Sequence, residues 1–256
     1  MATGVIERRT IAVVAAALLL PATAAARDDA AIDFTGTYEF AGPLIAIGPC
    51  DERINGRWET RCVAFPYNDA GRGLTIDARH DGSVECARDG LARLNTRTLY
   101  DIRIEQGADV ITIRYQYGDV VRQIFLDGRT PPADTPHTLH GFSTGRIEGD
   151  TLVIETTHLA PAFAAIAGDG RIGAPTGTRA RIVERWWPAP TPGNLLMDMV
   201  LDDPEYYERP FLMHRREWSR IGDHALEPWD CVDASELLFD DAPDLDEFFG
   251  NDDDPE

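Results

Sequence analysis

An arginine interrupts a face of apolar and aromatic residues in segment 110–127. A two-residue turn at Gly118-Asp119 predicts a hairpin that puts Tyr115 opposite Arg122, with Tyr117 on the same face. Because an unpaired buried charge is costly, Arg122 needs an acidic partner or an anionic ligand. Glu184, on the apolar face of a later strand, is the predicted partner. A structural ion pair and an anion-binding arginine in a ligand cavity are both open.

A second hairpin brings hydroxyl groups and an imidazole together. Around the two-residue turn Gly149-Asp150, we expect Ser143 opposite Thr156 and Gly141 opposite His158. Glycine leaves room that a larger side chain would fill. Ser143, Thr156 and His158 are therefore predicted to line a recess at one mouth of the folded sheet, where a small molecule binds. The alternative is that Thr156 and His158 end their strand in solvent.

The segment 141–145 matches the G-x-S-x-G pattern of a nucleophile elbow, with Ser143 as nucleophile and His158 as base. The elbow needs a buried strand before the serine and a helix after it, whereas a strand and a tight turn follow here. A serine hydrolase is therefore disfavoured. A hydrolase, lyase or isomerase that uses His158 as general acid or base remains the alternative to simple binding.

Several reaction classes lack their reactive group in this chain. All 24 residues counted as Lys+Arg are arginine, which excludes Schiff-base, pyridoxal-lysine and P-loop lysine chemistry. The one local group of metal ligands, Asp134, His137 and His140, lies in a loop punctuated by proline, and we predict no metal site and no cofactor. The net charge of −20 argues against nucleic acid and anionic membranes as partners.

The elements that position these residues are strands. Short runs of alternating polarity, joined by turn residues, predict strands at residues 99–105, 110–117, 120–127, 142–148, 151–158, 180–187, 195–201 and 210–218. With a first strand at 33–40, they predict an all-β fold, an antiparallel up-and-down meander that closes into a lipocalin-like (calycin-like) barrel. Residues 160–178 are expected to form a long loop with one helical turn at 162–167.

The first 26 residues have the pattern of a cleavable signal peptide. Arg8 and Arg9 precede an apolar run at 11–20, and the alanines at 24–26 offer a small-residue cleavage site. We therefore expect a periplasmic or secreted protein that does not insert into a membrane in its mature form. Both the general export route and a twin-arginine route are open.

Four cysteines lie in the exported part, where disulfides persist. Three pairings are possible. We favour Cys50 with Cys62, which closes a short loop, and Cys86 with Cys231, which ties the N-terminal region to the end of the last strand. A zinc site is disfavoured because the sequence contains no C-x-x-C pair.

The exported chain divides into three regions. Residues 27–98 are rich in Gly, Pro and Arg and are predicted to be irregular, residues 99–232 form the barrel, and residues 233–256 form an acidic tail that is expected to be disordered. Leu245, Phe248 and Phe249 of the tail fall on one face of a helix. Docking of the tail to a partner protein is therefore a third functional hypothesis.

The segment 141–156 reads G-x-S-x-G-R-x-E-G-D-T-L-V-I-E-T and resembles a signature of uncharacterised secreted β-rich proteins of Gram-negative bacteria. Asp127-Gly128-Arg129 before it, and Val183-Glu184-Arg185, Asp203-Pro204 and Cys231 after it, are similar to other landmarks of that family. Family members often have Gly-His-Ser where this chain has Gly141-Phe142-Ser143. The resemblance implies export and a β-rich fold, and it implies no particular activity.

The sequence thus predicts an exported protein that binds a small apolar or anionic molecule inside a barrel. Arg122, Tyr115 and Tyr117 are expected to contact the ligand from one wall, next to Glu184. Ser143, Thr156 and His158 are expected to contact it from another wall.

Overall fold

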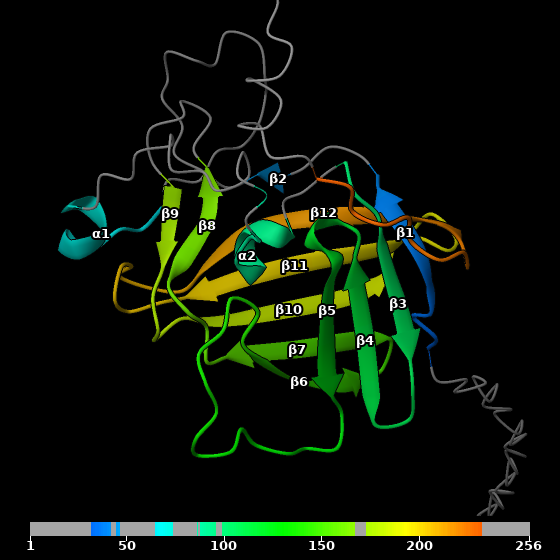
Figure 1. The fold of residues 1–256 in the computed structure, drawn as a ribbon, viewed down its shortest axis with the longest axis horizontal. Coiled ribbons are helices and arrows are strands. Elements are labelled where there is room, and N and C mark those ends of the chain that lie inside the picture. Colours follow the sequence, from blue (N-terminus) through cyan, green and yellow to red (C-terminus); the bar gives the residue numbers. More distant parts are fainter. Residues whose placement is uncertain are drawn as a thin grey trace, which may run out of the picture. The chain divides into compact units, whose positions relative to one another are not determined.

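The computed structural model describes residues 32–41, 45–46, 65–73, 86, 88–95, 99–166 and 173–231 (Figure 1). The predicted signal peptide, the Cys50–Cys62 pair and the acidic tail with Leu245, Phe248 and Phe249 lie outside the described residues.

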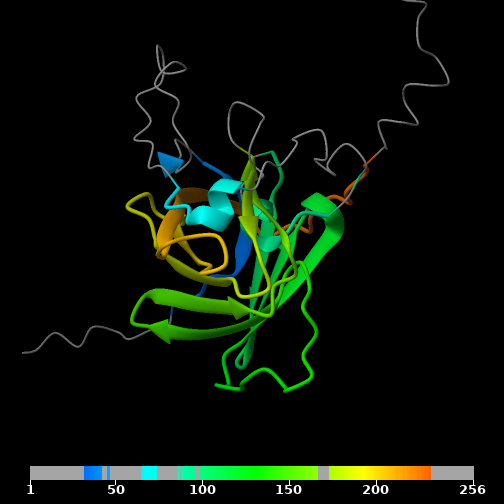
Figure 2. The same cartoon turned by 90° about the vertical axis from the view of Figure 1, so that its left-hand side faces the viewer.

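The described chain is mostly β, and nine of its strands close into a barrel (Figures 1 and 2). All eight strands predicted from residue 99 onward are present, and so is the first strand, with ends shifted by a few residues. The barrel strands are β1 (Gly36–Phe40), β3 (Ile102–Gln106), β4 (Val110–Tyr115), β5 (Val120–Phe125), β6 (Phe142–Glu148), β7 (Thr151–Thr157), β10 (Arg181–Pro188), β11 (Leu195–Asp202) and β12 (Phe211–Gly222). Pairing of β12 with β1 closes the barrel.

The barrel is mixed, so the prediction of a purely antiparallel meander is wrong at one place. Strands β5 and β6 are parallel, with Ile124 beside Ser143 and Phe125 beside Thr144. Parallel neighbours need a crossover of about a dozen residues or more, because the chain must return to the end where it started. Residues 126–141, which form the long loop at the bottom of Figure 1, make this return.

The β4–β5 hairpin differs from the prediction in its turn. Residues 116–119 form a four-residue connection that contains the 3₁₀ turn Tyr117–Asp119, with φ of 72° at Gly118. Tyr115 therefore pairs with Val120, and Ile113 pairs with Arg122. The predicted register, with Tyr115 opposite Arg122, is wrong by two residues. Because side chains alternate with a period of two, the shift leaves every residue on its predicted face.

The β6–β7 hairpin has the predicted register. Ser143 pairs with Thr156, Gly145 with Ile154 and Ile147 with Leu152. The two-residue turn Gly149-Asp150 is therefore confirmed, with Gly149 at a φ of 65°.

The segment predicted as a loop with a helical turn is a second, two-stranded sheet instead. Strand β8 (Ala162–Ile166) pairs with β9 (Gly173–Thr176). Its alanines favour a helix as an isolated segment, but pairing with β9 supplies main-chain hydrogen bonds that override this weak preference. The helical turn at 162–167 is therefore wrong.

Short elements interrupt the N-terminal region that was predicted to be irregular. They are β2 (Ile45–Ala46), which pairs with β12, and the helices α1 (Asp69–Gly73) and α2 (Leu91–Leu94). No helix in the described part of the chain is long and apolar enough to cross a membrane.

A disulfide ties this region to the end of the barrel domain. Cys86 and Cys231 are bonded across 145 positions of sequence, which confirms this predicted pair. Trp229, two residues before the second cysteine, packs on Tyr117 with 4.9 Å between ring centroids. The segment after β12 is thereby held over the β4–β5 turn.

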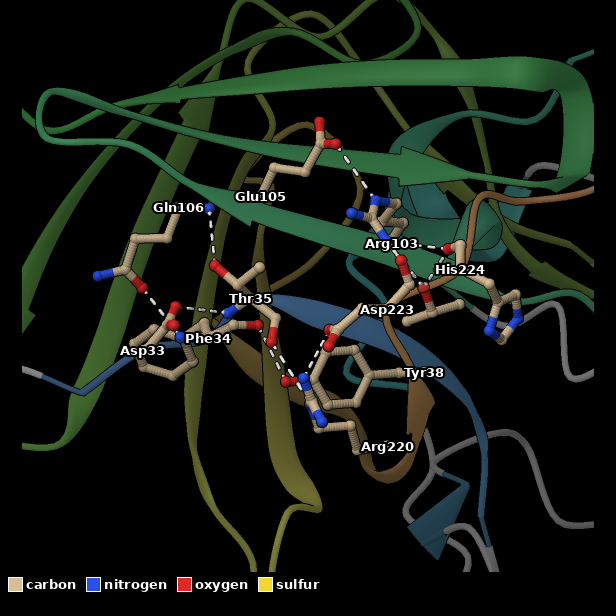
Figure 3. A network of polar contacts seen from close by, with 11 residues as sticks. Asp33, Phe34, Thr35, Tyr38, Arg103, Glu105, Gln106, Arg220, Asp223 and His224 are labelled. Atoms are coloured by element: carbon tan, nitrogen blue, oxygen red, sulfur yellow. Dashed lines mark hydrogen bonds and ion pairs between the residues drawn. The ribbon is translucent and has the colours of Figure 1, made fainter.

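A polar network joins the two ends of the described chain where the barrel closes (Figure 3). Arg103 of β3 donates from Nη1 to the main-chain oxygens of Asp223, at 2.6 Å, and His224, at 2.9 Å. Thr37 of β1 donates its hydroxyl to the same oxygen of His224 at 2.6 Å. Arg220 of β12 donates to the Asp223 carboxylate at 2.5 Å. These contacts hold β1 between β3 and β12.

Candidate functional site

A buried ion pair lies inside the barrel. The guanidinium of Arg122 on β5 donates from Nη2 to Glu184 Oε2 on β10, and the two residues are 3% and 0% exposed. The predicted partnership is therefore confirmed. Burial alone would lower the pKa of Arg122, but attraction to Glu184 more than offsets it and the pKa is raised. Arg122 is thus held charged beside Glu184, away from solvent.

The β6–β7 hairpin positions two hydroxyl groups that contact Arg122. Arg122 Nε donates to Ser143 Oγ at 3.0 Å, and Nη2 donates to Thr156 Oγ1 at 2.7 Å. The two hydroxyl oxygens also lie 2.9 Å from each other. Ser143 and Thr156 are 2% and 0% exposed, so the alternative that Thr156 and His158 end their strand in solvent is wrong for Thr156. They act as supports for the arginine.

Helix α2 brings a further partner to this network. Asn95, directly after α2, donates to Glu184 Oε1 at 3.5 Å and accepts a hydrogen bond from the Tyr115 hydroxyl at 3.3 Å. Burial raises the pKa of Tyr115 to about 12, so this hydroxyl keeps its proton and can donate. Asn95 therefore links strands β4 and β10 through the interior. The sequence analysis missed it because its segment was predicted to be irregular.

Tyr117 and His158 lie apart from the Arg122 network. Tyr117 packs on Tyr100, with 5.1 Å between ring centroids, and on Trp229. His158 follows β7 with a φ of 57°, which turns it out of the strand alternation. Its Nδ1 lies 2.9 Å from Thr157 Oγ1, and its ring lies 5.4 Å from that of His137. The predicted common wall of Ser143, Thr156 and His158 is therefore not formed.

The G-x-S-x-G segment is a strand and not a nucleophile elbow. Ser143 lies within β6 and its hydroxyl is engaged by Arg122 and Thr156. Gly145 has a packing role, because a Cβ at this position would lie 2.6 Å from Ile124 Cγ2. The pattern therefore reflects close approach of β5 and β6, and it positions no serine nucleophile.

No metal-binding group is formed by the described residues, which hold no cluster of three or more His, Cys, Asp or Glu side chains in ligating arrangement. His140, which belongs to the local group Asp134, His137 and His140, hydrogen-bonds to the main-chain oxygen of Asp89 at 3.1 Å. His137 Nδ1 lies 2.9 Å from the main-chain oxygen of Leu159.

A second polar group on the inner wall was not predicted. His214 and Arg216 of β12 are 3% and 2% exposed. His214 pairs with Met199 of β11, and Arg216 pairs with Met197. Met197 in turn pairs with Trp186 of β10, so Arg216, Met197 and Trp186 lie side by side across three strands. Five buried nitrogen atoms here have no hydrogen-bond partner among the described residues: Trp186 Nε1, His214 Nε2, Arg216 Nε, Arg216 Nη1 and Trp218 Nε1.

A β-bulge in β12 explains why the alternation of polar and apolar residues in the sequence did not predict that His214 and Arg216 face inward. The register with β11 shifts by one residue between the Met199–His214 and Val200–Leu212 pairs. Phe211 before the bulge and His214, Arg216 and Trp218 after it consequently all face inward. A strict period of two would put Phe211 and Arg216 on opposite faces. The tryptophan at 218 was the available signal, since such a side chain favours the core.

Burial sets the protonation of this second group. It lowers the pKa of His214 well below its usual value, and the nearby charge of Arg216 adds to the effect, so the imidazole is neutral at pH 7. Burial also lowers the pKa of Arg216 to about 10, which leaves the guanidinium charged at pH 7. The described residues supply no acidic partner to Arg216. Its guanidinium lies 5.3 Å from the centroid of the Phe40 ring.

Comparison of the chain with models of known protein families gave no match, and comparison with curated protein sequences gave none either.

Proposed function

We propose that this protein is an exported binding protein that holds a small anionic molecule inside its barrel. The observation that carries the proposal is a group of five nitrogen atoms on Trp186, His214, Arg216 and Trp218 that have no hydrogen-bond partner in the part of the chain that the structure describes. Each can donate a hydrogen bond, in the case of His214 in the tautomer with its proton on Nε2. A wall of donors with a net positive charge fits a ligand that is negatively charged and rich in acceptors.

A purely structural role accounts poorly for this wall. More than about 90% of buried polar groups in proteins have a partner, and an unpaired buried charge is costly. Arg122 shows the ordinary solution in the same barrel, since it has Glu184, Ser143 and Thr156 as partners. Arg216 lacks that solution among the described residues, and an anionic ligand would supply it.

The Arg122 network serves as a scaffold for the site in this proposal. Its ion pair and hydroxyl contacts occupy the guanidinium except at Nη1, which has no partner in the described part of the chain. This differs from the sequence-based expectation that Arg122, Tyr115 and Tyr117 contact the ligand. The cation that remains to be neutralised is Arg216.

Two sequence features support export and a family likeness. The signal-peptide pattern at 1–26 agrees with the Cys86–Cys231 disulfide, because disulfides persist outside the reducing cytosol. The signature that resembles secreted β-rich proteins forms the β6–β7 hairpin, and its Ser143 and Thr156 hold Arg122. We propose that this chain is a lipocalin-like barrel related to that family.

Native mass spectrometry of the protein purified from the cells that make it tests the proposal. We expect the folded protein to carry a small acidic molecule that is released when the protein is denatured. Recovery of the bare polypeptide mass from several growth conditions, under spray settings that preserve known complexes, would contradict it.

A further inference from the structure

The second polar group has a defined geometry on the inner wall. Trp186, Met197 and Arg216 form one row across β10, β11 and β12. The rings of Trp186 and Trp218 are stacked, with 6.2 Å between centroids and an interplanar angle of 22°. The unpartnered donors are thus surrounded by aromatic rings and methionine side chains.

The buried charged side chains inside the barrel carry one net positive charge, on Arg216. Arg122 and Glu184 neutralise each other, and His214 is neutral at pH 7. Asp89 and Arg93, which are also buried, lie 3.3 Å apart and neutralise each other as well. Apart from Asp203, the buried charges of the described residues therefore leave one positive charge, that of Arg216. Asp203, also buried, directly follows β11 and accepts hydrogen bonds from the main-chain N–H groups of Gly177 and Glu205. It does not neutralise Arg216.

We infer that the ligand is a carboxylate monoanion with a compact apolar body, bound through its carboxylate by Arg216 and His214 and packed against Trp186 and Trp218. The inference rests on the proposed binding function and names its site and ligand class. A carboxylate supplies two acceptor oxygens to guanidinium and indole N–H donors.

The charge favours a carboxylate over a phosphate. A monoanion brings the net charge of the interior to zero, whereas a phosphate dianion would leave an excess negative charge in a desolvated site. The aromatic surroundings match an apolar body and offer few acceptors for a polyhydroxylated one.

The packing of the interior favours a compact ligand. Trp186 and Trp218 are 0% and 1% exposed. The space beside Trp218 that Leu94, Ile102, Tyr115 and Tyr117 also line is too narrow for a water molecule. The apolar body of the ligand therefore cannot extend past Trp218 into this space, which argues against a long lipid chain.

Thermal unfolding of the full exported chain in the presence of acetate, benzoate or phosphate tests the inference. Acetate probes the carboxylate subsite, benzoate adds a compact apolar body, and phosphate at matched ionic strength probes the dianion. We expect benzoate to raise Tm at lower concentration than acetate, by about 5 to 10 °C at about 100 times its Kd, and phosphate to give no saturable shift. Tryptophan fluorescence should change over the same benzoate concentrations.

Two variants locate the effect. Arg216→Met should abolish the benzoate shift while remaining folded, because it replaces an unpaired buried cation by an apolar side chain of similar length. Arg215→Met is the matched control on the same strand, since Arg215 points outward and pairs with Asp198 at 2.6 Å. It should keep the full shift.

The outcomes separate the inference from the proposed function. A benzoate shift that survives in Arg216→Met, an equal shift with phosphate, or no shift with either carboxylate would overturn the inference. If native mass spectrometry nevertheless finds a bound small molecule, the binding function stands with a different site or ligand class. If it finds none, both fail.

Discussion

Replacing Arg122 by Met removes the counter-charge of a fully buried carboxylate. Glu184 would stay 0% exposed, with Asn95 at 3.5 Å as its remaining hydrogen-bond partner among the described residues. Removing one member of a buried pair costs about 3 to 5 kcal/mol. For a domain of this size, that corresponds to a fall in Tm of about 6 to 20 °C.

The double variant Arg122→Met/Glu184→Met should be much more stable than either single variant. Without the two charges, the hydroxyls of Ser143 and Thr156 still hydrogen-bond to each other at 2.9 Å. Tyr115 can still donate to Asn95 at 3.3 Å. Few polar groups are left unpaired, so we expect the double variant to lie within about 2 kcal/mol of the wild type.

Urea denaturation of the oxidised protein, followed by circular dichroism, measures these free energies of unfolding. Arg215→Met, which breaks a surface pair with Asp198, is the control and should cost no more than about 1 kcal/mol. A double variant that loses the sum of the two single losses would refute the reasoning, because it would show that the charges do not depend on each other. A loss below about 1 kcal/mol in Arg122→Met would refute it as well.

Three further predictions concern other parts of the fold. The neutral, buried His214 has a pKa lowered well below its usual value, so the unfolded state binds more protons and stability falls as the pH drops below about 6.5; His214→Gln should flatten this loss in urea titrations at neutral and acidic pH, and equal slopes would contradict it. Gly145→Ala places a Cβ 2.6 Å from Ile124 Cγ2 and should cost about 1 to 3 kcal/mol, whereas an unchanged urea midpoint would show that β5 and β6 do not approach so closely. Replacing both Cys86 and Cys231 by Ser releases a link across 145 positions and should cost about 2 to 5 kcal/mol, measured against the wild type under non-reducing conditions; no difference would argue against the disulfide.

The strands and the interior position of Arg122 could be predicted because they follow local rules. Side chains in a strand alternate between two faces, so a charged residue among apolar ones shows which way it points. The partnership of Arg122 with Glu184 followed from the same rule applied to β10, and the structure confirms it. The two-residue error in the predicted β4–β5 register did not change which side chains point into the barrel, because side chains alternate with a period of two.

The remaining features depend on contacts between distant segments. The parallel pairing of β5 with β6 is decided by how residues 126–141 cross the barrel, which no local pattern reports. The bulge in β12 appears only when the strand pairs with β11, and it is what turns Arg216 inward. The positive φ of His158 ends the alternation one residue too early for the predicted site.

A crystal structure of the protein purified from the cells that make it, without added carboxylate, tests the central claim most directly. We predict a non-protein group inside the barrel with an acceptor oxygen about 3 Å from the guanidinium of Arg216 and apolar atoms against Trp186 and Trp218. An acidic side chain of the protein paired with Arg216, or ordered water alone at these donors, would contradict the account.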